Sequence, residues 1–176
     1  RLLRSFGQGL FNFPHGGTID RAGNLWMTDA RGGNGIGHQA IKLSPEGKVL
    51  MTLGTPGVAG GGATHFNAPS DVVVAPNGDV FVADGHGLDG NNRVVKFSKE
   101  GKFLKEWGKT GYGPGEFRTL HAIAMDSRGR VFVGDRSNNR IQLFDQEGKF
   151  LTMWTQFGRP SGIFFDVRRS ASMWIS

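Results

Sequence analysis

The sequence of 176 residues has no cysteine, no long apolar run and no helical periodicity. The absence of cysteine excludes a disulfide framework and a thiolate metal site, and it leaves the redox compartment undecided. No apolar stretch reaches the length that spans a membrane, and no signal peptide is visible, although the chain opens at Arg1 without a methionine. No window keeps an apolar period of three to four residues, so we predict no amphipathic helix.

Negative charge is also in short supply, because 15 acidic residues face 21 lysines and arginines and leave a net charge of +6. A net positive charge is one feature of proteins that bind nucleic acids. The lysines, however, recur at equivalent turns, each after Glu-Gly and near acidic residues: Lys48, Lys102 and Lys149. Charges dispersed over turns are typical of a solvated surface and not of a basic binding stripe. We therefore predict no nucleic-acid partner.

The sequence is rich in glycine (29) and phenylalanine (14), and it repeats itself. Residues 117–154 restate residues 66–107 closely and residues 11–53 more loosely. Each copy holds four short strand patterns separated by turn residues, which in the last copy fall at 122–125, 130–133, 140–144 and 150–154. One such sheet buries too little apolar surface to be stable alone, so the copies must stack radially. This pattern predicts an all-β propeller of four-stranded antiparallel blades.

The repeat divides one propeller domain, residues 1–176, into blades. We expect full blades at 11–65, 66–116 and 117–156 and part of a fourth at 157–176, where the pattern breaks after Asp166. Residues 1–10 match the end of a preceding blade, with a closing strand over 2–6. With about three full blades and partial blades at both ends, the ring could be closed by further chain, by self-association or by the N-terminal strand.

The blades draw on one frame: Pro-His-Gly, then Asp, Gly-Asn, an aromatic strand ending in Asp, Asn-Asn-Arg, a Gly-Lys turn and a closing Trp-Gly. This frame resembles the NHL repeat. Over residues 2–166 the order of blades is most similar to the peptidyl-alpha-hydroxyglycine alpha-amidating lyase group, whose propellers are six-bladed. The resemblance implies a secreted or periplasmic protein and zinc-dependent cleavage of a carbon–nitrogen bond, which gives a peptide amide and glyoxylate. The alternative is a non-catalytic scaffold that binds a peptide, a protein or a small molecule in the axial channel or on the loop face.

Two histidines occupy one repeat position. The residue four places after the phenylalanine that opens each blade is, in order, His15, Ser70, His121 and Ser161. This position begins the innermost strand and lines the axial channel, and three histidines from alternate blades of a six-bladed ring would meet around one zinc ion. The resemblance implies that His15 and His121 are two of three zinc ligands, with the third in a blade beyond Ser176, so a metal site here needs a further segment, a second chain or another ligand. The alternative is that both histidines pack in the channel mouth or hydrogen-bond to the backbone. The resemblance also implies a structural calcium ion bound partly by the backbone carbonyl of Gly17.

The second blade has a longer loop, 84–93, than its counterpart at 135–140, and such insertions usually map to the binding face. The family has a tyrosine general base in this loop, and His86 takes its place here. Neutral imidazole can accept a proton, so the resemblance implies that His86 is catalytic. An exposed loop histidine without a chemical task is the alternative.

Other polar residues fit the scaffold better than a reaction. Asp29, Asp84 and Asp135 each end a second strand, where a carboxylate can accept hydrogen bonds from the backbone of the next turn. Arg93 and Arg140 follow the Asn-Asn pairs, and we expect them to brace neighbouring loops.

Overall fold

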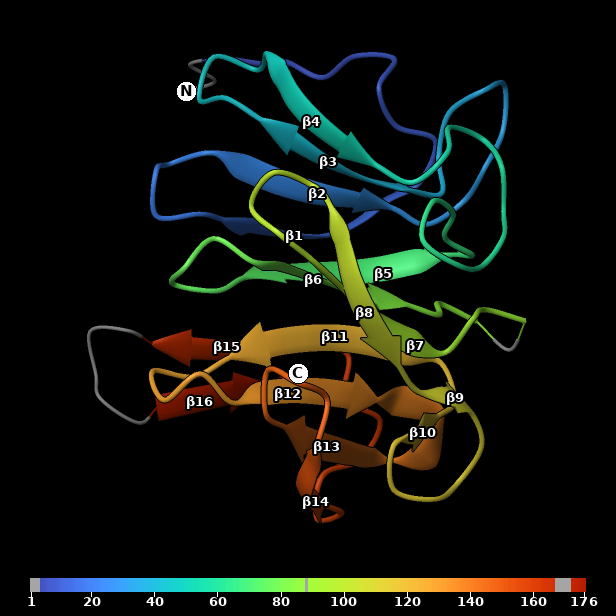
Figure 1. The fold of residues 1–176 in the computed structure, drawn as a ribbon, viewed down its shortest axis with the longest axis vertical. Helices are drawn as coiled ribbons and strands as arrows, with labels where there is room; N and C mark the ends of the chain where they lie inside the picture. The colour runs from blue at the N-terminus through green and yellow to red at the C-terminus, as the bar shows by residue number, and fades with distance from the viewer. Residues whose placement is uncertain (1–3, 88, 167–171) are drawn as a thin grey trace.

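The computed structural model describes residues 4–87, 89–166 and 172–176, and it contains three four-stranded antiparallel sheets with strands in sequence order (Figure 1). The first blade is formed by β1 (Pro14–Ile19), β2 (Leu25–Asp29), β3 (Gln39–Leu43) and β4 (Val49–Leu53). The second is formed by β5 (Pro69–Val74), β6 (Val80–Asp84), β7 (Arg93–Phe97) and β8 (Phe103–Trp107). The third is formed by β11 (Leu120–Met125), β12 (Val131–Asp135), β13 (Arg140–Phe144) and β14 (Phe150–Trp154). The predicted blade architecture is confirmed.

Smaller elements join and follow the blades. The short parallel pair β9 (Lys109–Thr110) and β10 (Glu116–Phe117) connects the second blade to the third. A single 3₁₀ turn, η1 (Arg136–Asn138), follows β12, and β15 (Ile163–Asp166) pairs with β16 (Ser172–Ile175) as a fourth, two-stranded sheet. No helix in the described part of the chain is long and apolar enough to cross a membrane.

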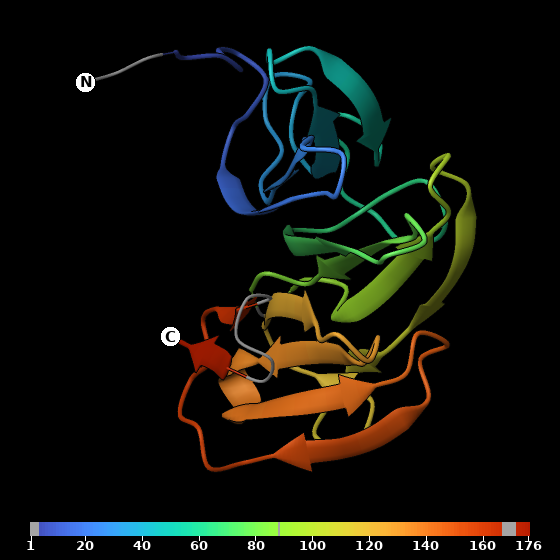
Figure 2. The same cartoon turned by 90° about the vertical axis from the view of Figure 1, so that its left-hand side faces the viewer.

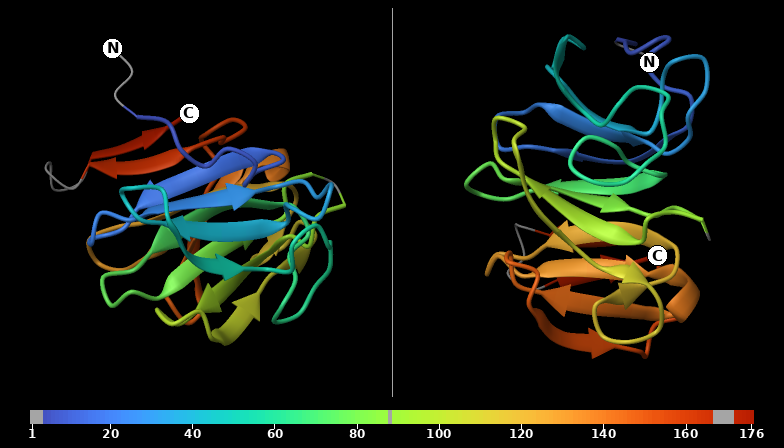
Figure 3. Two further views of the ribbon diagram at one scale, coloured as in Figure 1. Left: turned by 90° about the horizontal axis from the view of Figure 1, so that it is seen from above. Right: turned by 45° about the vertical axis from the view of Figure 1, so that its right-hand side comes forward.

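The blades follow one another along an arc, with the N-terminal blade at one end and the two-stranded sheet near the other (Figure 2). Their first strands lie next to each other: β1 contacts β5, β5 contacts β11, and β11 contacts β15. Figure 3 shows the same succession from two further sides. The first strands therefore form the inner wall that faces the propeller axis, as the repeat predicted.

Apolar side chains between successive sheets hold the blades together. Trp26, Phe81 and Phe132 occupy the same place in their second strands, and each is at most 1% exposed. Trp26 packs with Val82 and other residues of the second blade, Phe81 packs with residues of the third, and Phe132 packs against the fourth sheet. Full burial of a side chain of this size contributes about 1.5–3 kcal/mol, so the interfaces between blades are the core of the protein.

The three strand-terminal aspartates have a scaffold role, as predicted, but their partners are backbone amides of the segment before the first strand of the same blade and not those of the next turn. The carboxylate of Asp29 accepts hydrogen bonds from the amides of Asn12 (2.7 Å) and Phe13 (2.6 Å). Equivalent bonds run from Asn67 to Asp84 (2.8 Å) and from Arg118 to Asp135 (2.7 Å). Each of these hydrogen bonds fixes the segment that leads into the first strand of the same blade.

Two buried arginines brace loops through hydrogen bonds, also as predicted. The Nε of Arg93 donates to Asp84 at 2.9 Å, and its Nη2 donates to the carbonyl of His65 at 2.7 Å. Arg140 binds Asp135 through Nε at 2.7 Å, and its Nη atoms donate to three carbonyls of the 112–116 loop. Each arginine thus ties the end of a second strand to the loop that precedes its blade.

The ends of the described chain differ from the expected pattern. The strand predicted over 2–6 is absent in its described part, where Arg4 to Phe6 form no strand. Phe6 instead covers Gly47, at the turn between β3 and β4. A closing strand has to pair with a third strand of its own blade, and none lies beside these three residues. At the other end, residues 167–171 lie outside the described residues, and the strand β16 was not predicted.

Candidate metal centre

A backbone irregularity directs two histidines toward the axis. The β1–β2 pairing shifts register between Pro14 and Gly17, and the β11–β12 pairing shifts between Leu120 and Ala122. His15 and His121 lie within these shifts. A β-bulge re-aims the side chain that it carries. The second blade has the same shift at Ser70, so the equivalence of this position in the repeat is structural as well as sequential.

Each of the two histidines is oriented by a carbonyl of the next blade. Nδ1 of His15 lies 2.7 Å from the carbonyl oxygen of Ser70, and Nδ1 of His121 lies 2.9 Å from that of Ser161. A carbonyl only accepts hydrogen bonds, so these contacts place the proton of the neutral ring on Nδ1 and leave the lone pair on Nε2. Histidines that bind metals commonly donate their second nitrogen to a carbonyl or carboxylate in this way.

His86 joins these two histidines from the loop after β6. Its ring centroid lies 4.4 Å from that of His15 and 5.1 Å from that of His121, and the latter two are 4.7 Å apart. One ring nitrogen from each of the three lies within 4.8 Å of the others, and all three side chains are partly buried. The chain therefore assembles a three-histidine cluster from three consecutive blades.

Sequence reasoning selected all three histidines but did not predict that they converge. It placed His15 and His121 at one wall position, which the structure confirms, and it expected the remaining ligand beyond Ser176. His86 was predicted only as a catalytic residue in a loop. The path of an inserted loop is not encoded in the repeat, so its contact with the other two rings could be seen only in three dimensions.

The environment lowers the pKa of two of these histidines, His86 and His121. Burial is the main cause that lowers the pKa of His86 to about 4, and the neighbouring His15, His121, Arg136 and Arg31 lower it further when they are charged. Burial also lowers the pKa of His121, although its bond to the Ser161 carbonyl acts in the opposite direction. At neutral pH both rings are uncharged, which is the form that binds a metal ion.

Positive side chains surround the histidines. Arg136 lies in η1, and its buried Nε has no hydrogen-bond partner among the described residues. The guanidinium of Arg31 stacks 4.3 Å from the ring centroid of Phe13, which itself lies 5.9 Å from His15 and 6.2 Å from His86. An unpaired buried donor costs about 1–3 kcal/mol, and more if it is charged, so an anion bound beside Arg136 would be stabilised.

The sequence analysis missed Arg136, although a pattern could have revealed it. The residue after the strand-terminal aspartate is Ala30 in the first blade, Gly85 in the second and Arg136 in the third. A large charged residue at a position that is otherwise small interrupts the repeat. In a repeat protein, such interruptions on the loop face are candidates for binding residues.

The expected calcium ligand, Gly17, lies in β1 opposite Met27. A side chain at Gly17 would come within 2.7 Å of the carbonyl oxygen of Trp26, so glycine is needed for close packing. The carboxylate of Asp71 in the adjacent strand accepts hydrogen bonds from the backbone N–H groups of Ile123 (3.0 Å) and Val72 (2.9 Å). Burial raises the pKa of this carboxyl group to about 7. No cluster of three acidic groups lies at Gly17 in the described chain, so the calcium role stays a prediction.

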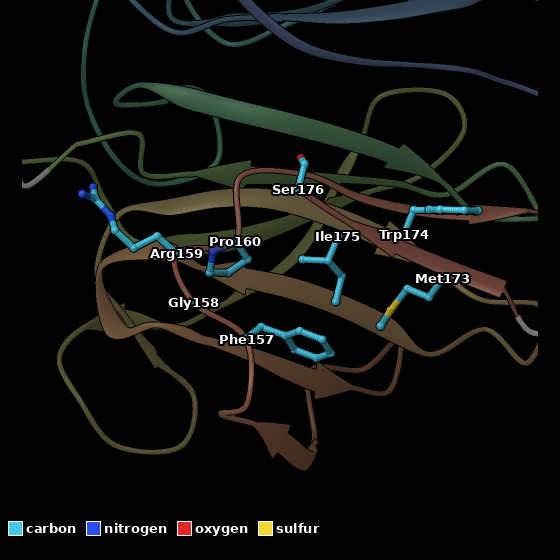
Figure 4. Close-up of a pocket in the computed structure, with 8 residues that line it drawn as sticks. All are labelled: Phe157, Gly158, Arg159, Pro160, Met173, Trp174, Ile175 and Ser176. Carbon is cyan, nitrogen blue, oxygen red and sulfur yellow. The ribbon is translucent and has the colours of Figure 1, made fainter.

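A well-formed hollow lies elsewhere in the described structure. It has a volume of about 520 Å³ and lies beside β16, where none of the three histidines lines it (Figure 4). Its lining comes from residues 157–160 and 173–176. Arg159 is the one titratable side chain in this lining, so the histidine cluster is the better candidate for chemistry.

Comparison with known proteins places the fold in a family. A family model described as a six-bladed β-propeller matches residues 68–153. The human NHL repeat-containing protein 3 is 39% identical over 115 residues, which make up 64% of this chain and 33% of that protein. The chain is an NHL-type β-propeller. These matches support the resemblance to the NHL repeat that the blade motifs indicated.

Amidating enzymes are also similar to this NHL-type propeller. The peptidyl-glycine alpha-amidating monooxygenase B of Xenopus laevis is 41% identical over 143 residues, covering 77% of this chain and 15% of that protein. A probable peptidyl-alpha-hydroxyglycine alpha-amidating lyase of Caenorhabditis elegans is 37% identical over 140 residues, 77% of this chain and 38% of that protein. The chain thus spans well under half the length of the curated relatives it matches.

Solved structures confirm the fold of the NHL-type propeller. The virginiamycin B lyase from Staphylococcus aureus superposes with a TM-score of 0.63 over 93% of this chain and 48% of that chain, at 18% sequence identity. The hydrazine synthase of Kuenenia stuttgartiensis superposes with a TM-score of 0.60 over 85% of this chain and 38% of that chain, at 16% identity. At these identities the likeness concerns architecture alone.

Proposed function

We propose that this propeller is part of a metal-dependent lyase that cleaves peptides ending in α-hydroxyglycine into a peptide amide and glyoxylate. The observation that carries the proposal is the convergence of three histidines on the propeller axis, two of them oriented by backbone carbonyls. Its relatives include proteins named for this lyase activity, and the blade motifs resemble theirs.

The donor set fits zinc. Imidazole nitrogen is a preferred zinc ligand, and the cluster in the described chain contains no carboxylate, which calcium or magnesium would require. Zinc bound at a catalytic site would act as a Lewis acid and polarise the substrate hydroxyl group. We propose His15 and His121 as ligands, with their Nδ1 atoms donating to the carbonyls of Ser70 and Ser161 and their Nε2 atoms free to bind.

The remaining residues of the site suit the substrate. In the reaction, the hydroxyl proton is removed, the carbon–oxygen bond becomes a carbonyl, the carbon–nitrogen bond breaks, and the departing amide nitrogen gains a proton. The substrate carries a carboxylate on the reacting carbon. We propose that Arg136, whose Nε is buried without a partner in the described structure, binds this carboxylate. His86 lies in the same cluster, so it would either accept the hydroxyl proton, the role that the resemblance implied, or bind the ion.

The test is turnover of a synthetic peptide with a C-terminal α-hydroxyglycine, measured as glyoxylate release and as peptide amide by chromatography. We expect both products in equal amounts from the zinc-loaded protein, loss of both after chelation, and recovery when zinc is restored. His65→Ala is the control, because His65 lies outside the cluster and its ring contacts Thr64.

Full zinc loading without glyoxylate would contradict the lyase proposal. The non-catalytic scaffold that the sequence left open would then be the better account, with the loop face as its binding surface.

A further inference from the structure

We infer that His86 is the third protein ligand of the metal ion. The inference rests on the proposed function, since it concerns the ion that His15 and His121 would hold. It differs from the role of proton acceptor that the family resemblance implied for His86.

Distances allow this coordination. Three nitrogens whose separations are at most 4.8 Å all lie within about 2.8 Å of a common point, compared with about 2.0–2.1 Å for a zinc–nitrogen bond. The remaining gap is below about 1 Å per ligand, which side-chain rotation can close. The rings are tilted by 52° to 70° to one another and are not stacked, so their nitrogen-bearing edges can face a shared ion.

The loop holds His86 in place but leaves its ring free to bind. The amides of Gly85 and His86 both donate to the carbonyl of Ala68, at 3.0 and 2.7 Å, which anchors the loop to the segment that enters β5. In the described structure the ring nitrogens of His86 make no hydrogen bond to protein, whereas the rings of His15 and His121 each make one. One nitrogen of the His86 ring thus lies within 4.8 Å of a nitrogen of each of the other two rings, and a metal ion between the three could accept a lone pair from each.

The number of ligands points the same way. Catalytic zinc sites generally have three protein ligands and one open position. Within the described residues, His86 is the histidine, cysteine or acidic group that joins His15 and His121 in one cluster of this size. If His86 binds the ion through one nitrogen, that nitrogen cannot accept the substrate proton, so the proton must pass to another acceptor.

Zinc affinity separates a ligand from a proton acceptor. We would measure it by competition with a chromophoric zinc chelator for the wild-type chain and for His86→Ala, His86→Gln, His15→Ala and the control His65→Ala. We expect wild type and His65→Ala to bind one zinc ion with equal affinity. Both His86 variants should bind at least about 100-fold more weakly, because loss of even a supporting partner of a ligand costs 10- to 100-fold.

Cobalt substitution provides a second measurement that does not depend on turnover. The visible absorption of bound Co²⁺ reports its ligands, so the bands should change in both His86 variants and stay unchanged in His65→Ala. Circular dichroism checks that each variant is folded. Wild-type zinc affinity and an unchanged cobalt spectrum in both His86 variants would overturn the inference while leaving the metal site intact. No zinc binding by wild type, or unchanged binding by His15→Ala, would instead overturn the proposed function.

Discussion

The carboxyl group of Asp71 provides a sharp test of the electrostatics of the inner wall. Asp71 lies in β5 between β1 and β11, and burial raises its pKa to about 7. The hydrogen bonds from the amides of Ile123 and Val72 favour the ionised form but do not offset the loss of solvent. Replacement by asparagine removes the charge and keeps one acceptor, at the cost of turning an amide group toward one of those N–H donors.

The size and sign of the effect follow from linkage. The folded-state pKa of Asp71, about 7, exceeds the ordinary value of 3.8, so the folded protein holds the proton more tightly between these two pH values. The wild type therefore loses stability as the pH rises from about 4 to about 7. Each pKa unit corresponds to about 1.4 kcal/mol, and because the side chain is partly exposed to the channel we expect a loss of roughly 2–4 kcal/mol in total.

The assay is urea unfolding of metal-free protein at several values between pH 4.5 and 8.5, comparing wild type with Asp71→Asn. The difference in unfolding free energy should move in favour of the variant by roughly 2–4 kcal/mol across this range. Working with the difference matters, because His86 has a lowered pKa of about 4 and shifts wild-type stability in the opposite direction between about pH 4 and 6.5. Asp89→Asn, at an exposed loop position, controls for the amide. A wild-type-to-variant difference that stays constant with pH would refute the reasoning.

Three further predictions concern packing and substrate binding. Phe132→Ala should lower the unfolding free energy by about 3–5 kcal/mol in urea titration, because the ring is 1% exposed between the third blade and the fourth sheet; a loss below about 1 kcal/mol would contradict that role. Gly16→Ala should destabilise the chain and weaken zinc binding, since a Cβ there would lie 2.4 Å from the carbonyl oxygen of Ser70, whereas Gly61→Ala meets nothing within 4 Å and should be neutral. Arg136→Gln should raise KM for a carboxylate-bearing substrate about 10-fold or more with zinc affinity unchanged, and an unaltered KM would remove Arg136 from the site.

The sequence predicted the blade architecture because the information for it is local. Alternation of apolar and polar residues sets each strand, and Gly-Asn or Gly-Lys turns end it. The repeat then places His15 and His121 at one position of the inner strand, and the structure finds both within the same register shift. The aspartates that end the second strands were assigned correctly for the same reason, since their partners lie at a fixed offset in every blade.

The conformations at the two ends of the described chain could not be predicted from the sequence. The irregular path of Arg4 to Phe6 and the strand β16 depend on which strands are available as neighbours, and a local pattern does not specify this.

The three-histidine site shows most clearly what the sequence determined and what the tertiary structure decided. By itself, the sequence determined the propeller, the wall position of two histidines and the loop that carries the third. Only the tertiary structure decided that these three rings meet, and that the unpaired Nε of Arg136 is buried on the same side of the molecule. The physical reason is that the relative position of loops on different blades is fixed by packing between sheets, as with Trp26 and Phe81, and not by the residues of the loops themselves.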